Sequence, residues 1–321
     1  MSARTIRSRV VDQDPRLWAL WAASRPSQLA LVVLVYALGV GMASTGSPLV
    51  VHGPGPAGQS VAALGPRVAL GALALLPVTV AVHYANEFAD ADTDALAERT
   101  PFSGGSGALA VTGLPASFLG RATAVMTAVA VALLAWAALT GALPSRATAL
   151  LAAILVAGLA YSLPPVALVR RGVGEVVNAA LGGVLLPVYG VAVVGRPTLT
   201  AWLAVLPFAG LVGCNLLATH WPDREADRAV GKRTLAVRWP ATRIRRVYVL
   251  LAVTSLAVAT VLWVDGVFPD AVALAYLVPV PLLVWGWRTL TRQRSPLPAV
   301  LAMVALAVAS TAAWWWVGPL L

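Results

Sequence analysis

The sequence predicts an all-α membrane protein, a bundle of about nine transmembrane helices. Hydrophobic residues make up 59% of the 321 residues and charged residues only 11%, whereas soluble globular chains carry about 25% charged residues. The mean hydropathy is +0.82, and the apolar residues form runs close to the ~20 residues that cross a hydrocarbon core. These observations exclude a soluble enzyme, a disordered chain and a secreted disulfide scaffold, and the single cysteine, Cys214, permits no internal disulfide.

Charged residues and helix breakers divide the chain into a polar N-terminal segment and a series of apolar runs. Residues 1–26 are rich in arginine and contain no convincing cleavage site, so we expect a retained cytoplasmic arm followed by a transmembrane domain over 27–321. Strands of a transmembrane barrel would be shorter and would alternate in polarity, so the runs predict helices. The predicted spans are 27–43, 67–90, 117–141, 146–163, 173–195, 199–221, 243–264, 270–288 and 297–319.

The basic residues predict the orientation of these spans. If the spans alternate from a cytoplasmic N-terminus, all of the 23 lysines and arginines except Arg67, Arg146 and Arg196 lie on the cytoplasmic side. Short cytoplasmic loops of membrane proteins are enriched in basic residues. We therefore expect an integral protein of the plasma membrane with its C-terminus outside. The net charge of +10 then reflects topology and contact with lipid head groups, and no nucleic-acid partner is expected.

Two acidic clusters lie at the predicted cytoplasmic ends of the second and sixth spans. Asn86, Asp90 and Asp94 are spaced by four residues, and Asp223 and Asp227 repeat that spacing in the second half of the chain. A four-residue step turns a helix by only about 40°, so each set shares one face. One such cluster alone is typical of a solvated helix end. Its recurrence predicts an internal pseudo-repeat in which the second and sixth helices face each other.

Carboxylates brought together across a bundle repel one another unless cations lie between them. Hard oxygen ligands at this density suit Mg²⁺, which binds a few carboxylates and leaves other positions for water and phosphate. We expect His83 and His220, one turn from the acids, to be polar lining, because imidazole is not a preferred Mg²⁺ ligand. The predicted metal ligands are Asp90, Asp94, Asp223, Asp227 and Asn86.

Each acidic cluster leads into a loop that suits a phosphate group. The first loop carries an arginine and a Gly/Ser run whose backbone N–H groups can approach phosphate oxygens, although most such runs are simple turns. The second holds the only lysine of the chain beside arginines, cations that can neutralise a diphosphate and that also serve the topology. The candidate phosphate-binding residues are Arg99, Ser103, Arg228, Lys232 and Arg233.

A third segment, Tyr161-Ser-Leu-Pro-Pro165, ends the fourth span at the same face. The aromatic face of Tyr161 can stabilise a cation, or the residue can belong to an interfacial aromatic belt. Glu175 follows at the start of the fifth span, where a carboxylate complements the N-terminus of its helix.

At these residues the chain resembles the UbiA superfamily of intramembrane aromatic prenyltransferases. Asn86-x3-Asp90-x3-Asp94 matches the first aspartate-rich motif of that family, Asp223-x3-Asp227 matches the second, and the Tyr161 segment looks like the tyrosine-containing segment between them. Within the superfamily, residues 227–238 most resemble the 1,4-dihydroxy-2-naphthoate branch, which belongs to menaquinone biosynthesis.

The resemblance implies transfer of a prenyl group from a polyprenyl diphosphate to an aromatic acceptor within the membrane. Two Mg²⁺ ions held by the aspartates, with Asn86 assisting, would bind the diphosphate, and Tyr161 would face the allylic cation. The basic residues Lys232, Arg233, Arg99 and Arg228 would stabilise the departing pyrophosphate. The prenyl tail would occupy a lateral hydrophobic opening toward the lipid.

Two alternatives stay open at this point. A terpene cyclase would use the same diphosphate-ionising machinery without an aromatic acceptor. A secondary transporter would also have many helices and an internal repeat, but transporters place essential carboxylates near the bilayer midplane, whereas here the acids gather at one face.

Overall fold

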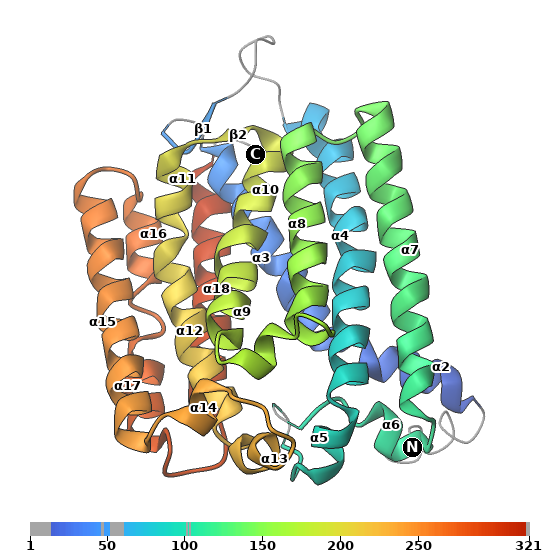
Figure 1. Ribbon diagram of the computed structural model, residues 1–321. Coiled ribbons are helices and arrows are strands. Elements are labelled where there is room, and N and C mark those ends of the chain that lie inside the picture. Colours follow the sequence, from blue (N-terminus) through green and yellow to red (C-terminus); the bar gives the residue numbers. More distant parts are fainter. Residues whose placement is uncertain (1–13, 46–47, 52–60, 101, 103, 319–321) are drawn as a thin grey trace, which may run out of the picture.

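The computed structural model describes residues 14–45, 48–51, 61–100, 102 and 104–318, and within these it contains nine segments long and apolar enough to cross a membrane. They form one helical bundle (Figure 1), which confirms the predicted all-α membrane fold. The segments are α2 with α3 (Pro15–Ala23 and Pro26–Ser44), α4 (Val61–Ala89), α7 (Ala116–Thr140), α8 (Ser145–Ser162), α9 with α10 (Gly174–Ala180 and Leu186–Val194), α11 with α12 (Leu199–Ala204 and Leu206–His220), α15 (Ala241–Val264), α16 with α17 (Asp270–Ala275 and Val280–Thr289) and α18 (Leu297–Val317).

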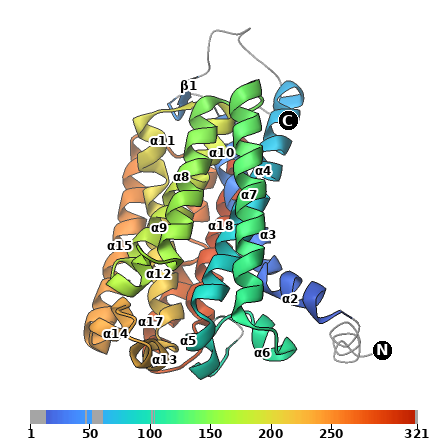
Figure 2. The same ribbon diagram turned by 45° about the vertical axis from the view of Figure 1, so that its right-hand side comes forward.

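The first segment differs most from the sequence expectation, because part of the predicted N-terminal arm is helical. Residues 15–23 form α2, which lies at an angle to the bundle (Figures 1 and 2). Pro26 opens α3, and the preceding Arg25 has a positive φ of 52°. A residue before proline is disfavoured in the helical region, so the chain turns here instead of continuing as one helix. Residues 1–13 of the arm lie outside the described residues.

Helix α3 packs against α10 and α18 in the middle of the bundle. A Cβ at Gly39 would overlap the carbonyl oxygen of Pro187, and one at Gly190 would overlap the carbonyl oxygen of Tyr36. Small residues at such positions let two helices approach closely in a membrane, where close packing replaces the hydrophobic effect. The contact therefore depends on glycine on both sides.

Corresponding helices in the two halves of the chain have similar packing partners. Helix α4 packs on the next long helix, α7, and α12 packs on its own successor, α15. Each of α4 and α12 is followed by a short helix, α5 (Ala91–Leu96) and α13 (Arg224–Ala229), and these two short helices contact each other. The contact between the two short helices brings the ends of α4 and α12 together, and the pseudo-repeat itself stays a prediction.

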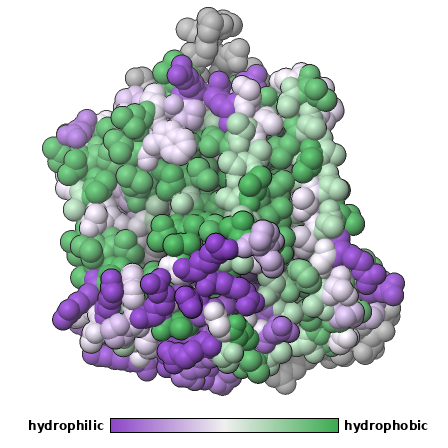
Figure 3. Space-filling model, in the orientation of Figure 1, coloured by the Kyte–Doolittle hydropathy of each residue, from purple (hydrophilic) through white to green (hydrophobic). Residues whose placement is uncertain are grey.

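Polar residues gather at the end of the bundle where α4 and α12 finish, here called the aspartate end. It carries α5, α13, α6 (Ala108–Thr112) and α14 (Leu235–Arg238). Figure 3 shows a hydrophilic surface there and a mainly apolar belt above it. At the opposite end Val50–Val51 (β1) pairs antiparallel with Arg196–Pro197 (β2), and α18 finishes there (Figure 1).

Candidate functional site

Both acidic motifs lie at the end of a long helix, and the first continues across the break between α4 and α5. Asp90 separates α4 from α5, yet its N–H donates to the Asn86 carbonyl at 2.9 Å and the Asp94 N–H donates to the Asp90 carbonyl at 2.8 Å. Asp223 lies at the N-cap position of α13, and the Asp227 N–H donates to its carbonyl at 2.8 Å. The four-residue hydrogen-bond pattern thus persists, which keeps each motif on one face as its spacing predicts.

The two motifs meet at one cavity of about 1540 Å³. Its wall at the aspartate end is polar, while helices α2, α3 and α18 contribute mainly apolar side chains. Leu17, Trp21 and Leu301 line this cavity and are also exposed on the surface, at 64%, 62% and 39%. The cavity therefore opens sideways through the apolar part of the bundle. The predicted site residues in its wall are Asn86, Asp90, Asp94, Arg99, Tyr161, Asp223, Asp227 and Lys232.

Lys232 lies between the two motifs. Its Nζ is 2.8 Å from Asp90 Oδ1 and 3.4 Å from Asp227 Oδ1, and its side chain is only 5% exposed. Burial alone would lower the pKa of Lys232, but Asp90 and Asp227 outweigh it and raise that pKa above its usual value. The ammonium group is therefore positively charged at neutral pH, inside the cavity wall.

The glycine-rich loop after α5 folds over both motifs. The Gly104 N–H donates to Asp223 Oδ2 at 3.2 Å. Gly105 has a φ of 70°, and a Cβ there would overlap the Asp94 carboxylate, so only glycine fits in both respects. Burial, and next the charges of Glu87 and Asp90, raise the pKa of Asp94 to about 7.

The basic residues predicted to bind phosphate are divided by the fold. Arg99 lines the cavity, where its Nη2 donates to the Ser106 carbonyl at 2.5 Å. Arg228 and Arg233 are exposed and do not belong to the cavity wall. Ser103 lies outside the described residues. Of the three predicted phosphate-binding residues in the second loop, the fold brings Lys232 to the acidic motifs and leaves the two arginines at the surface.

Tyr161 is 9% exposed and lines the cavity. Its burial favours a place in the site over the interfacial-belt alternative. Its neighbour Ser162 accepts a hydrogen bond from Asn86 Nδ2 at 3.4 Å, and the same amide donates to Asp90 Oδ2 at 3.2 Å. Asn86 thereby connects the tyrosine segment to the first motif.

An ion pair that the sequence analysis did not identify holds the loop in place. Glu87, 3% exposed, accepts from Arg25 Nε at 2.8 Å, from the Ser106 N–H at 2.8 Å and from Ser106 Oγ at 2.6 Å. One buried carboxylate thus joins the turn between α2 and α3 to the glycine-rich loop. The position of Glu87 inside the first acidic cluster was the available signal, but its partners are distant in sequence.

The two histidines of the cavity wall have different partners. His83 Nδ1 lies 2.8 Å from the Ser24 carbonyl oxygen, whereas His220 Nδ1 lies 3.1 Å from Glu175 Oε1. Glu175 also accepts from the Leu235 N–H at 2.6 Å. It lies in the first turn of α9, as expected, and in addition caps the start of α14.

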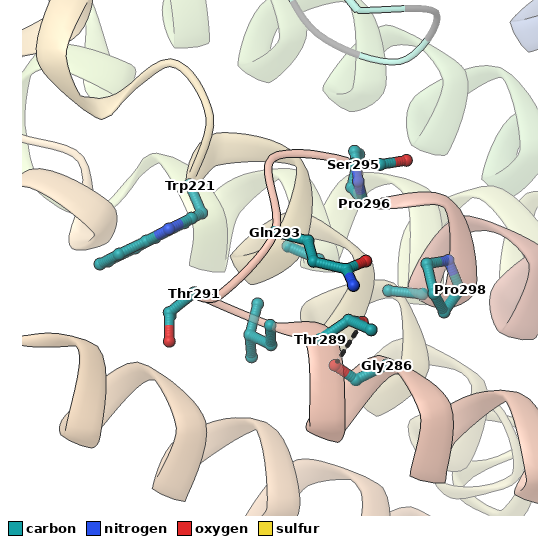
Figure 4. Close-up of a pocket in the computed structure, with 11 residues that line it drawn as sticks. Trp221, Gly286, Thr289, Thr291, Gln293, Ser295, Pro296 and Pro298 are labelled. Carbon is teal, nitrogen blue, oxygen red and sulfur yellow. Dashed lines mark hydrogen bonds between the residues drawn. The ribbon is translucent and has the colours of Figure 1, made fainter.

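A separate, smaller pocket at the aspartate end is not a substrate site. It lies beside Trp221 and the turn between α17 and α18 (Figure 4) and has a volume of about 10 Å³. In its wall Thr289 Oγ1 donates a hydrogen bond to the Gly286 carbonyl. The volume is about that needed for one water molecule.

The donor set of the large cavity fits a hard divalent cation that shares its coordination with a ligand. Within the described ranges, no three or more His, Cys, Asp or Glu side chains lie close enough together to hold one ion by themselves. Mg²⁺ does not require such a cage, because it usually uses one or two carboxylates and completes its coordination with water and phosphate oxygens. Asp90 and Asp227 both reach one ammonium group, so oxygens from the two motifs already share a cation.

The sequence model of the UbiA prenyltransferase family matches residues 49–307. No curated protein matches the chain. Among solved structures, a UbiA homologue from Archaeoglobus fulgidus bound to DMAPP and Mg²⁺ is 16% identical with a TM-score of 0.60, over 93% of this chain and 99% of that one. A UbiA homologue from Aeropyrum pernix K1 is 15% identical with a TM-score of 0.61, over 88% and 95%.

A structure described as digeranylgeranylglyceryl phosphate synthase is 12% identical with a TM-score of 0.62, and the similarity covers 94% of this chain and 99% of that one. At these identities the matches show a common fold.

Proposed function

The chain belongs to the UbiA prenyltransferase family, and from this premise we propose that it transfers a prenyl group from a polyprenyl diphosphate to an aromatic acceptor in a Mg²⁺-dependent reaction. The observation that carries the proposal is one cavity with two parts. Both aspartate motifs lie in its polar end, and the rest of its wall is apolar and opens sideways. The polar end with the aspartates suits a diphosphate, and the apolar part of the wall suits a prenyl chain. A solved homologue is described as bound to DMAPP and Mg²⁺.

The acidic residues would bind the diphosphate indirectly, by holding Mg²⁺ ions that contact it. Asp90, Asp94, Asp223 and Asp227, with Asn86, would hold Mg²⁺, which when bound supplies Lewis-acid stabilisation of the leaving group. The hydrogen bonds from Gly104 to Asp223 and from Thr234 Oγ1 to Asp227 Oδ2, at 3.2 and 3.3 Å, fix the orientation of the second motif.

The cationic residues of the cavity wall have the role of neutralising pyrophosphate. Lys232 is buried between the motifs, so its charge acts in a medium where electrostatic stabilisation is strong. Arg99 approaches from the glycine-rich loop. Arg228 and Arg233 are exposed, and we assign them to the rim. The buried Tyr161 presents an aromatic side chain to the cavity, where it stabilises an allylic cation.

We further propose that the acceptor is 1,4-dihydroxy-2-naphthoate and that the product belongs to menaquinone biosynthesis. Residues 227–238 resemble that branch of the superfamily. The same proposal includes a location in the plasma membrane, with residues 1–26 and the aspartate end cytoplasmic, since most basic residues belong to that side.

The test uses purified protein, Mg²⁺ and geranyl diphosphate, with 1,4-dihydroxy-2-naphthoate or 4-hydroxybenzoate as acceptor and product identification by mass. Asp90→Ala and Asp223→Ala should abolish Mg²⁺-dependent pyrophosphate release and leave membrane insertion intact. Asp270→Asn is the matched control, an exposed aspartate at the start of α16 on the opposite end. Full release by both alanine variants would contradict the site, and a terpene formed without acceptor would identify a cyclase.

A further inference from the structure

The cavity wall contains a histidine paired with a buried carboxylate, which the proposed metal and diphosphate chemistry does not use. His220 is the last residue of α12 and Glu175 lies in the first turn of α9, two helices that pack together. The His220 side chain is 19% exposed and the Glu175 side chain 4%. His220 precedes Asp223 by about one helical turn and is therefore close to the diphosphate-binding end.

The pairing decides which ring nitrogen is free. An ionised carboxylate only accepts hydrogen bonds, so His220 Nδ1, 3.1 Å from Glu175 Oε1, must carry the proton. In the neutral imidazole Nε2 then has a lone pair, as in other carboxylate–histidine pairs that act as bases. Because His220 lines the cavity, Nε2 is the ring nitrogen left for a ligand.

The surroundings of Glu175 strengthen this base. Its Oε1 accepts from the Leu235 N–H as well as from His220, but its Oε2 is buried and has no hydrogen-bond partner among the described residues. A buried carboxylate that is only partly satisfied favours a positive charge beside it. Asp227 of α13 and Lys232 are the other charged groups near the imidazole.

We propose that His220, oriented by Glu175, is the general base that removes the acceptor's proton during prenyl transfer. The proposal rests on the proposed function, and it assigns the acceptor to the class of hydroxylated aromatic compounds. The bond between the first prenyl carbon and the diphosphate oxygen breaks, and its electron pair leaves on pyrophosphate. A new bond forms between that carbon and a ring carbon of the acceptor. The C–H bond of this ring carbon breaks, its electron pair restores the aromatic ring, and the proton moves to His220 Nε2 and then to water. Glu175 stabilises the imidazolium that forms.

The acceptor side of the cavity has further polar groups near this base. Asn178 lies one turn after Glu175 on α9, and Asn215 and Thr219 precede His220 on α12. All three line the cavity, next to apolar residues of the same helices such as Phe208 and Val212. An apolar wall with a few polar groups is the usual surface for orienting an aromatic ring that carries hydroxyl groups.

The experiment measures transfer from geranyl diphosphate to 1,4-dihydroxy-2-naphthoate over a range of pH, together with calorimetric binding of geranyl diphosphate in the presence of Mg²⁺. His220→Gln should lower kcat by about 10²-fold or more, the usual contribution of a general base. Its binding of geranyl diphosphate should not change, and the rise of kcat with pH should disappear. Glu175→Gln should lower kcat in the same way and to a smaller extent.

His83→Gln is the comparison variant, because it removes a cavity-lining imidazole whose hydrogen-bond partner is a backbone carbonyl instead of a carboxylate. It should retain the wild-type dependence of kcat on pH. If His220 and Glu175 only brace α9 against α12, both variants should lose thermal stability and diphosphate binding together and keep the wild-type pH profile; that result overturns the inference.

Two further outcomes separate this inference from the function on which it rests. Transfer by His220→Gln within about threefold of wild type overturns the role of His220 and leaves the proposed function intact. Failure of the wild-type protein to prenylate any phenol or naphthol overturns the proposed function, and the inference falls with it.

Discussion

Lys232 Nζ lies 2.8 Å from Asp90 Oδ1, although one residue follows the sixth membrane span and the other follows the second. The same ammonium group is 3.4 Å from Asp227 Oδ1. One buried cation therefore connects the two halves of the chain at the point where their acidic motifs meet. Without a cation, these carboxylates would repel one another in a medium of low dielectric constant.

Replacement of this lysine tests its role at the diphosphate. Lys232→Met should lower kcat/KM for geranyl diphosphate by at least about 100-fold, since a preorganised cation at the leaving group is lost. Arg228→Gln and Arg233→Gln should stay within about threefold, as expected for exposed side chains. The rate of pyrophosphate release is measured for all three variants. Equal losses in the three variants would show that the exposed arginines also reach the diphosphate.

The glycine-rich loop provides a test of the close contact with Asp94. Gly105→Ala should weaken Mg²⁺ activation by about 10–100-fold, the range found when groups that support metal ligands are disturbed, because its Cβ would displace the carboxylate. Gly113→Ala is matched in backbone strain, with a φ of 67° and open space around its Cβ, and should leave the Mg²⁺ titration unchanged. A similar shift in both variants would assign the effect to backbone strain alone.

The pair of Arg25 and Glu87 should contribute to stability as well as to loop position. Breaking a buried ion pair costs about 3–5 kcal/mol, because the remaining charge loses its counter-ion. The cost is smaller here, since Arg25 is 21% exposed and Glu87 keeps its two hydrogen bonds from Ser106. Arg25→Gln should therefore lower the unfolding temperature in detergent. A double-mutant cycle with Glu87→Gln measures the coupling, and additive effects in that cycle would argue against a direct interaction.

The crossing of α3 and α10 should be intolerant of even one methyl group. Gly39→Ala would place its Cβ against the Pro187 carbonyl, and overpacking of this kind costs about 1–3 kcal/mol. Gly182→Ala, in the π-helical turn Leu181–Leu185 between α9 and α10, meets no atoms within 4 Å, so helix propensity should make it neutral or stabilising by up to about 1 kcal/mol. Thermal unfolding of both variants in detergent provides the comparison.

Much of the fold was predictable because a bilayer imposes simple requirements on a sequence. Helices that cross it must be long and apolar, and the predicted spans agree with the described helices apart from their ends. The exception is α2, where Trp18 and Trp21 lie among the arginines that suggested a polar arm. Local charge density hid this helix, whereas the packing of Trp18 and its neighbours against α4 and α6 stabilises it.

The site was predictable only where its geometry is local. The four-residue spacing of Asp90 and Asp94 fixes a shared face whatever the rest of the chain does. By contrast, Lys232, Arg228 and Arg233 are equivalent in sequence as cations of one loop, and only the fold separates the buried lysine from the exposed arginines. The contact between Glu87 and Arg25 was likewise invisible, since each belongs to a different helix.

The sequence by itself determined that this chain spans a membrane, that acidic motifs end two of its helices and that these motifs repeat. Hydropathy and helical periodicity act over a few neighbouring residues, so they can be read along the chain. The tertiary structure decided which cation enters the cavity, which carboxylate holds the glycine-rich loop and which histidine pairs with Glu175. Those contacts join residues from different helices, and their formation depends on how the whole bundle packs.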